Sequence, residues 1–185
     1  MVPPRFRHPP HGRRLGPLPW FAAVVLASWL LLAMPVAMAM QQAEGAVTPA
    51  PYASGDAWLD GRLADIDVYA ARHPEAFLAE IERYAGVPRA YVRSLLQQPG
   101  WRAGDAWFAC FLARAVEAGC RDVVRARSHA GADADWARVA EEAGADAAAF
   151  ARLRLALADS YRRWARPLRP DAALERHLAE LGLHY

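Results

Sequence analysis

The chain has 185 residues, 55% of them hydrophobic, which is enough for one domain with a core of its own. All 22 positive residues are arginines, and four of them precede residue 20, so 18 arginines face 20 acids in the rest of the chain. A balance this close to neutral lacks the positive excess of a nucleic-acid-binding domain, so nucleic acid is not an expected partner.

The first forty residues have the layout of a secretory signal. Residues 1–19 are basic, an apolar run follows over Trp20–Met34, and Pro35 then breaks the helix. Ala37-Met38-Ala39 supplies small residues at the two positions that a signal peptidase reads. This pattern predicts a signal peptide over 1–39.

The alternative is an uncleaved membrane anchor over residues 20–40, which is long enough to cross a hydrocarbon core of ~30 Å. In both cases the arginine-bearing end stays in the cytoplasm, because positive flanks are retained there. The rest of the chain is then expected outside the inner membrane. It would be periplasmic or secreted after cleavage, and anchored in the inner membrane with a periplasmic domain without it.

Residues 40–55 are small and polar and contain prolines, which predicts a flexible tether before a domain over 56–185. In that domain apolar residues recur with helical spacing, and no stretch alternates long enough to be a strand. We expect an all-α, compact bundle of about seven to eight short helices. The first carries Leu59, Leu63, Ile66 and Ala70, and the others begin near Pro74, Pro88, Asp105, Cys120, Asp133 or Asp135, Asp146 and Asp171.

The longest expected helix has one apolar face. Its apolar residues recur at intervals of three or four: Phe150, Leu153, Leu157, Tyr161 and Trp164. Arg152, Asp159 and Arg163 fall on the other face, where we expect water. Because this helix is long and has one continuous apolar face, we expect it to be the central helix against which the others pack.

Cys110 and Cys120 are the only cysteines. Outside the cytoplasm two cysteines favour a disulfide. If residues 105–118 form one helix, however, Cys110 lies ~12 Å below its end, and the bond requires the chain to double straight back. The alternative is two separately buried thiols.

Other polar groups are expected to have ordinary roles. The cluster of Asp56, Asp60, Asp65 and Asp67 on the first helix is interpreted as a solvated face near a helix N-terminus. The histidines lack the spacing of a helical zinc site, so we expect no metal and no cofactor.

The candidate binding residues are aromatic or basic. A tryptophan between glycines at a helix junction is a typical binding anchor, and clustered arginines can meet the phosphates or carboxylates of a lipid or a cell-wall polymer. The candidates are Trp101, Trp107, Arg114, Arg121 and Arg125.

A series of short motifs runs through roughly residues 58–165. The motifs are Val87-Pro88-Arg89, Gly100-Trp101, Gly104-Asp105, Ala109-Cys110, Gly119-Cys120-Arg121 and Trp136 with Val139-Ala140. This series resembles a group of uncharacterised exported helical proteins of Gram-negative bacteria. The resemblance implies export and a helical fold, and it brings no activity.

Two functions remain open. The first is a non-catalytic, exported envelope protein that binds another envelope protein or an anionic surface polymer, since no nucleophile with a base is visible. The second is an envelope hydrolase acting on peptidoglycan, with a carboxylate such as Glu80 or Glu82 as general acid.

Overall fold

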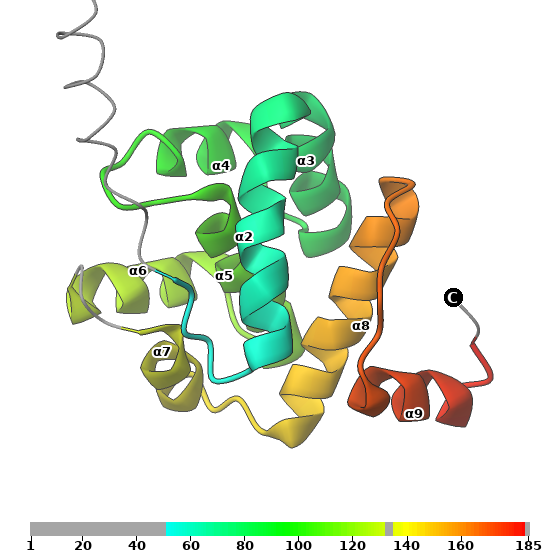
Figure 1. Ribbon diagram of the computed structural model, residues 1–185. Coiled ribbons are helices and arrows are strands. Elements are labelled where there is room, and N and C mark those ends of the chain that lie inside the picture. Colours follow the sequence, from blue (N-terminus) through cyan, green and yellow to red (C-terminus); the bar gives the residue numbers. More distant parts are fainter. Residues whose placement is uncertain (1–50, 132–134, 184–185) are drawn as a thin grey trace, which may run out of the picture. The chain divides into compact units, whose positions relative to one another are not determined.

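The computed structural model describes residues 51–131 and 135–183, and over these residues it is helical without any strand (Figure 1). This confirms the expected all-α fold. The elements are α2 (Ala57–Arg72), α3 (Pro74–Glu80), the π-helical turn η1 (Ile81–Ala85), α4 (Arg89–Leu95), α5 (Ala103–Ala115), α6 (Cys120–Ala130), α7 (Trp136–Glu142), α8 (Ala147–Arg163) and α9 (Ala172–Glu180).

The expected signal peptide over 1–39, the alternative anchor over 20–40 and most of the expected tether lie outside the described residues. Among the helices that are described, none has both the length and the apolar character needed to cross a membrane.

Aspartates cap α7, α8 and α9, as the sequence predicts. Asp135, Asp146 and Asp171 each accept a hydrogen bond from the backbone N–H three residues later, at 2.9, 2.7 and 2.9 Å. Such a cap satisfies one of the donors that a helix start leaves without a partner. Asp105 differs from the expectation, because α5 begins three residues before the position that a cap at Asp105 implies. Arg102 is the N-cap residue there, and the Asp105 carboxylate accepts its backbone N–H at 2.9 Å.

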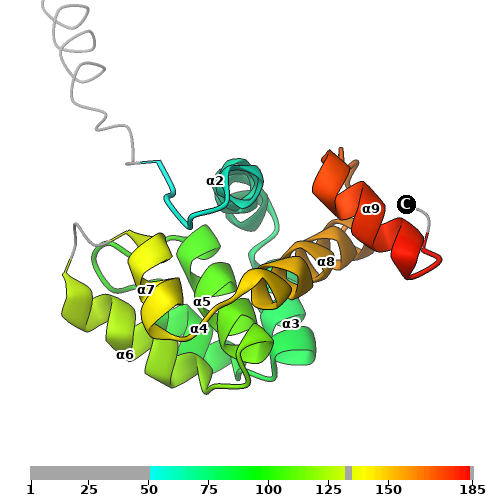
Figure 2. The ribbon, with the colours of Figure 1, turned by 90° about the horizontal axis from the view of Figure 1, so that it is seen from below.

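Helix α5 is the centre of the domain, and the expectation that α8 would be the central helix is wrong. Every residue from Gly104 to Ala113 is buried. A helix without a polar face must be covered on all sides, and α2, α6, α8 and η1 all pack against α5. Figures 1 and 2 show α6 and α7 on one side of this centre and α9 on the opposite side.

Helix α8 buries the predicted stripe through its middle part. Leu153, Leu157 and Tyr161 are buried, while Phe150 and Trp164 at its two ends are partly exposed. A second side of α8 carries Ala158, which forms a small separate apolar cluster with Leu174 and Leu178 of α9. Because two sides of α8 are covered, Arg154 and Arg163 have little exposed surface, 17% and 20% of their side chains.

Arg152 is exposed, as the sequence predicts, but it also contacts another helix. Its guanidinium donates two hydrogen bonds to the carbonyl oxygen of Ala115, at 3.0 and 2.8 Å. This carbonyl is at the C-terminal end of α5, where helical carbonyls lack an intrahelical partner and favour a cation. Arg152 therefore faces water, as expected, and in addition contacts the end of α5.

The acidic cluster on α2 is not a solvated face. Asp56 caps α2 and accepts from Arg154 of α8 at 2.6 Å, and Asp60 accepts the backbone N–H of Ser54 at 2.8 Å. Asp65 accepts from the Tyr161 hydroxyl and forms an ion pair with Arg166. The expectation fails chiefly because Asp56 and Asp65 have partners on or after α8, 96 or more residues away along the chain.

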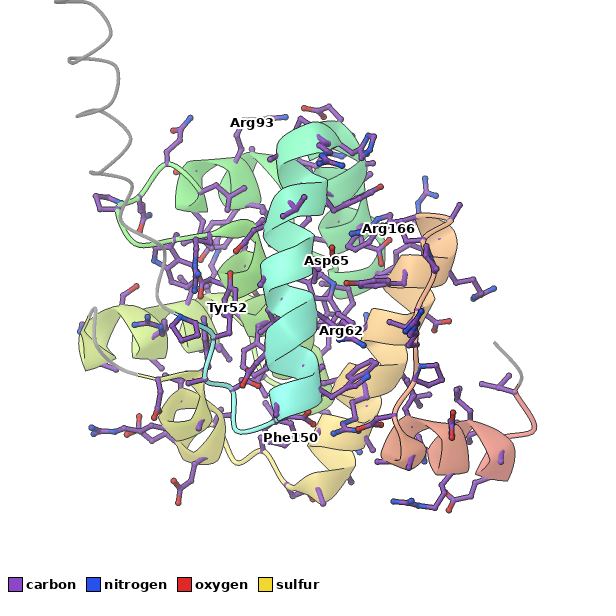
Figure 3. All side chains as sticks on the ribbon, in the orientation of Figure 1. Tyr52, Arg62, Asp65, Arg93, Phe150 and Arg166 are labelled. Atoms are coloured by element: carbon purple, nitrogen blue, oxygen red, sulfur yellow. A yellow bond between two sulfur atoms is a disulfide. The ribbon has the colours of Figure 1, made fainter. Side chains whose placement is uncertain are left out.

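Figure 3 shows Asp65 and Arg166 close together where α2 faces the C-terminal end of α8; their charged atoms are 2.7 Å apart. Asp67 lies one half-turn further along α2 and makes a different contact. Its carboxylate accepts from the Tyr52 hydroxyl at 3.0 Å and from the backbone N–H of Gly104 at 2.8 Å. Burial raises the pKa of the Asp67 carboxyl, although both hydrogen bonds oppose the shift.

The segment before α2 is part of the domain, so the expected tether over 40–55 extends too far. Tyr52 and Ser54 are buried, and the Ala53 carbonyl oxygen accepts the backbone N–H of Ala137 at 2.8 Å. The Tyr52 hydroxyl occupies the space beside Gly104 that the side chain of any other residue would need. A Cβ at Gly104 would clash with the Tyr52 hydroxyl and would lie 2.6 Å from the carbonyl oxygen of Leu63.

Cys110 and Cys120 form a disulfide, with their Cα atoms 4.5 Å apart. The bond is possible because α5 ends at Ala115 rather than at residue 118, so Cys110 is only ~7.5 Å below the helix end. Glu117 then adopts a left-handed backbone conformation with φ of 58°, and the chain reverses directly into α6. Of the two alternatives left open by the sequence, the structure contains the disulfide.

Reduction of this disulfide is expected to lower the free energy of unfolding by about 2–3 kcal/mol, because a closed loop of this size restricts the unfolded chain. Urea melts with and without dithiothreitol measure the difference. The double variant Cys110→Ala/Cys120→Ala is the control, and its melt should not respond to the reductant. Identical melts of the native protein in both conditions would contradict the prediction.

Candidate functional site

Two adjoining pockets share residues of η1 and α8; the first also includes residues of α5, and the second includes residues of α2 and α3. The Arg114 pocket has a volume of about 290 Å³ and is lined by Tyr84, Phe111, Arg114, Ala115, Arg152, Ala156, Asp159 and Arg163. The Arg83 pocket has a volume of about 340 Å³ and is lined by Tyr69, Ala76, Ala79, Glu80, Arg83, Tyr84, Arg163 and Trp164. The two pockets meet at Tyr84 and Arg163, which line both.

Tyr84 and Arg163, the two residues that line both pockets, are held in place by contacts with buried residues. The Arg163 guanidinium lies 3.6 Å from the centre of the Tyr84 ring and forms an ion pair with Glu80. Glu80 also accepts the Ser160 hydroxyl at 2.6 Å, and Ser160 accepts the indole N–H of Trp107 at 3.3 Å. The Glu80 side chain is only 3% exposed. The negative charge of Glu80 is therefore neutralised inside the domain, and little of the carboxylate is accessible from the pockets.

The remaining charges of the two pockets are mostly positive. Asp159, the other acid, forms an ion pair with Arg162 at 3.0 Å. Arg83, Arg114 and Arg152 form no ion pair with any residue of the described part of the chain. Guanidinium groups are weakly hydrated forks of donors that match the oxygens of carboxylates and phosphates. The arrangement can therefore bind an anionic group in each pocket.

The five candidate binding residues of the sequence are not brought together. Arg114 lines the pocket named after it, whereas Arg121 lies 5.0 Å above the ring of Tyr91 on α4. Arg125 is exposed and forms an ion pair with Asp122 at 3.2 Å. The expected cluster of three arginines is thus divided between separate surroundings.

The expectation for Trp107 is wrong. Its side chain has no exposed surface, stacks on Phe111 with ring centres 4.4 Å apart, and donates to Ser160. It cannot touch a ligand at the surface. Trp107 instead supports the network beneath the Tyr84–Arg163 pair, because α5 is covered on all sides.

Trp101 is partly exposed and lines a third pocket of about 340 Å³, here called the Trp101 pocket. Its ring packs edge to face with Trp136, with centres 6.1 Å apart. The structure therefore allows the expected contact role for Trp101, at a place separate from the arginine pockets.

The carboxylates of Glu80 and Glu82, the two candidate general acids, both have partners within the domain. Glu80 binds Arg163 and Ser160 as described, and Glu82 forms an ion pair with Arg89 at 2.6 Å. A general acid needs a proton to give and a position against the substrate. Neither residue is placed for that role in this arrangement.

Sequence reasoning missed that Arg152 and Arg163 belong to the same site. Both fall on the face of α8 for which the sequence predicts water, although the sequence also contains the signal for a shared stripe. Arg152, Ala156, Asp159 and Arg163 follow one another at intervals of four, three and four residues, which puts them on one face of a helix. Tyr84 carried no comparable signal, since the π-helical turn η1 shifts its direction relative to an ordinary helix.

No family model, curated protein or solved structure matches this chain.

Proposed function

We propose that the helical domain is a non-catalytic binding module of the bacterial cell envelope, and that its ligand is an anionic polymer bound at the Arg114 and Arg83 pockets. One observation carries the proposal: the two pockets adjoin, and three of their arginines have no acidic partner in the described part of the chain. A ligand with regularly spaced negative groups can place one group in each pocket.

The placement in the envelope is supported by two independent features. The first is the predicted secretory signal, with its basic start, apolar run and Ala37-Met38-Ala39. The second is the disulfide, because such bonds persist in oxidising compartments and are rare in the cytosol. Mass spectrometry of the envelope fraction tests the placement, with Met40 expected as the first residue. An intact N-terminus in the membrane fraction would instead indicate the anchor, and a cytosolic protein would overturn the proposal.

Binding is tested with the full chain and three polyanions of different chemistry: poly-γ-glutamate, heparin and double-stranded DNA. Calorimetry should detect binding to at least one of the first two, weakened by salt. We expect Arg83→Gln and Arg114→Gln each to lower the affinity about tenfold, because each removes a charge-assisted hydrogen bond. Both arginines are exposed, so neither change should affect folding.

Arg176→Gln is the matched control, since Arg176 is an exposed arginine of α9 outside both pockets. Its affinity should stay within about twofold of the native value. An equal loss in all three variants would show attraction by net charge alone. If DNA is the tightest ligand, the proposed anionic envelope polymer is wrong. If no polyanion binds and an acidic envelope protein is captured at the same arginines, the ligand is that protein and not a polymer.

A further inference from the structure

The Trp101 pocket is a second, chemically different site. It lies where the segment before α5 meets the C-terminal end of α6. Its lining residues used below are Gln98, Trp101, Asp105, Arg127 and Ser128. None of them lines either arginine pocket.

Asp105 provides a buried acceptor on the wall of this pocket. Its side chain is 6% exposed, and its Oδ2 atom accepts from the backbone N–H and the Nε of Arg102. Within residues 51–131 and 135–183, its Oδ1 atom accepts the indole N–H of Trp136 at 2.7 Å and no second donor. Because a carboxylate oxygen has room for two donors, Oδ1 retains one acceptor position. A hydroxyl group of a ligand can donate to it.

The other polar groups have complementary capacity. The Ser128 hydroxyl donates to the Val124 carbonyl oxygen at 2.9 Å, so its lone pairs remain able to accept. The amide of Gln98 is exposed, and it can donate and accept. The Arg127 guanidinium lies on the same wall and is engaged within the domain: one of its N–H groups donates to the Gly131 carbonyl oxygen at 2.6 Å, and its centre lies 5.5 Å from the centre of the Trp136 ring.

Trp101 adds a fixed aromatic surface. Gly100 adopts a left-handed backbone conformation with φ of 80°, which turns the chain into the tryptophan. The Trp101 ring is then held against Trp136, and Trp136 is itself held by its hydrogen bond to Asp105. An aromatic ring immobilised in this way binds an apolar surface at little cost in conformational entropy.

The pocket lining carries one acid and one arginine, Asp105 and Arg127, so neither sign of charge is in excess. The Asp105 carboxylate is already paired with Arg102 at 3.4 Å. A neutral ligand with several hydroxyl groups, each able to donate and accept, and with a C–H face for the indole fits all of these groups. The volume of about 340 Å³ is at the small end of ligand pockets, which suits one sugar ring.

We propose that the Trp101 pocket binds one ring of a neutral carbohydrate. The ring stacks on Trp101, donates a hydroxyl hydrogen to Asp105, and shares further hydrogen bonds with Gln98 and Ser128. This site goes beyond the polyanion site and does not depend on it.

The test is saturation-transfer NMR and calorimetry of the full chain with chitotriose, cellotriose and maltotriose. We expect at least one trisaccharide to bind with an affinity in the millimolar range or better. Trp101→Ala should lower this affinity about tenfold or more, through the loss of the aromatic contact. Gln98→Ala, at an exposed position that leaves the fold intact, should lower it severalfold.

Tyr91→Ala is the matched control, as Tyr91 is a partly exposed aromatic residue outside the pocket. It should bind the sugar like the native protein, and so should Arg83→Gln and Arg114→Gln. The absence of binding to all three sugars, or equal affinities for Trp101→Ala and Tyr91→Ala, would overturn the proposal. Loss of polyanion binding in Gln98→Ala would likewise do so, by assigning the pocket to the polyanion surface.

Discussion

Arg163→Met is expected to lower the free energy of unfolding by about 3–5 kcal/mol. Removal of the guanidinium would leave the Glu80 carboxylate, whose side chain is 3% exposed, without its counter-charge. An uncompensated charge in a buried position is among the costliest defects that a single substitution produces. Urea melts followed by circular dichroism measure the loss.

Two further variants identify the cause. Glu80→Gln in the Arg163→Met background should recover most of the lost stability, because the buried charge is then gone and Ser160 can still donate to the amide oxygen. Arg162→Met, at a neighbouring exposed ion pair, should change the free energy of unfolding by no more than about 0.5 kcal/mol. If Arg163→Met and Arg162→Met unfold at the same urea concentration, then the Glu80–Arg163 ion pair is hydrated and does not hold Tyr84 and Arg163 in place between the two pockets.

Leu157→Ala is expected to cost about 2–5 kcal/mol, the sum of lost transfer energy and the cavity that remains. Leu157 lies at the middle of α8 and has no exposed surface. The same chemical change at Leu181, which is 51% exposed, serves as the control and should cost within about 0.5 kcal/mol. Native-like stability of Leu157→Ala would mean that α8 is not anchored in the core.

Local features of the sequence predicted the local features of the fold. The aspartates before α7, α8 and α9 act as caps because a cap needs only a side chain and a backbone N–H three residues away. Pro74 begins α3 as expected, since its missing N–H costs nothing in the first turn. The apolar stripe of α2 is buried, as its helical spacing indicates. Such features depend on residues within one or two turns of each other.

Features that depend on distant pairs were not predicted. Asp56 and Arg154 are 98 residues apart, and Glu80 and Arg163 are 83 apart. Each residue alone has the appearance of an ordinary surface charge, so the sequence favoured a solvated face and a wet side of α8. The disulfide remained open for a related reason, because it depends on where α5 ends, and helix ends are the least certain part of a periodic pattern.

The contact between Tyr52, Asp67 and Gly104 has a consequence for how this domain tolerates divergence. Most exposed positions can change with little effect, but these three depend on one another. Any side chain at Gly104 would displace Tyr52, and the loss of Asp67 would leave both a hydroxyl and a backbone N–H without their acceptor. Distant descendants of this sequence should therefore be recognisable by a tyrosine, an aspartate 15 residues later and a glycine 37 residues after that. Such a spacing would persist where the overall resemblance has been lost.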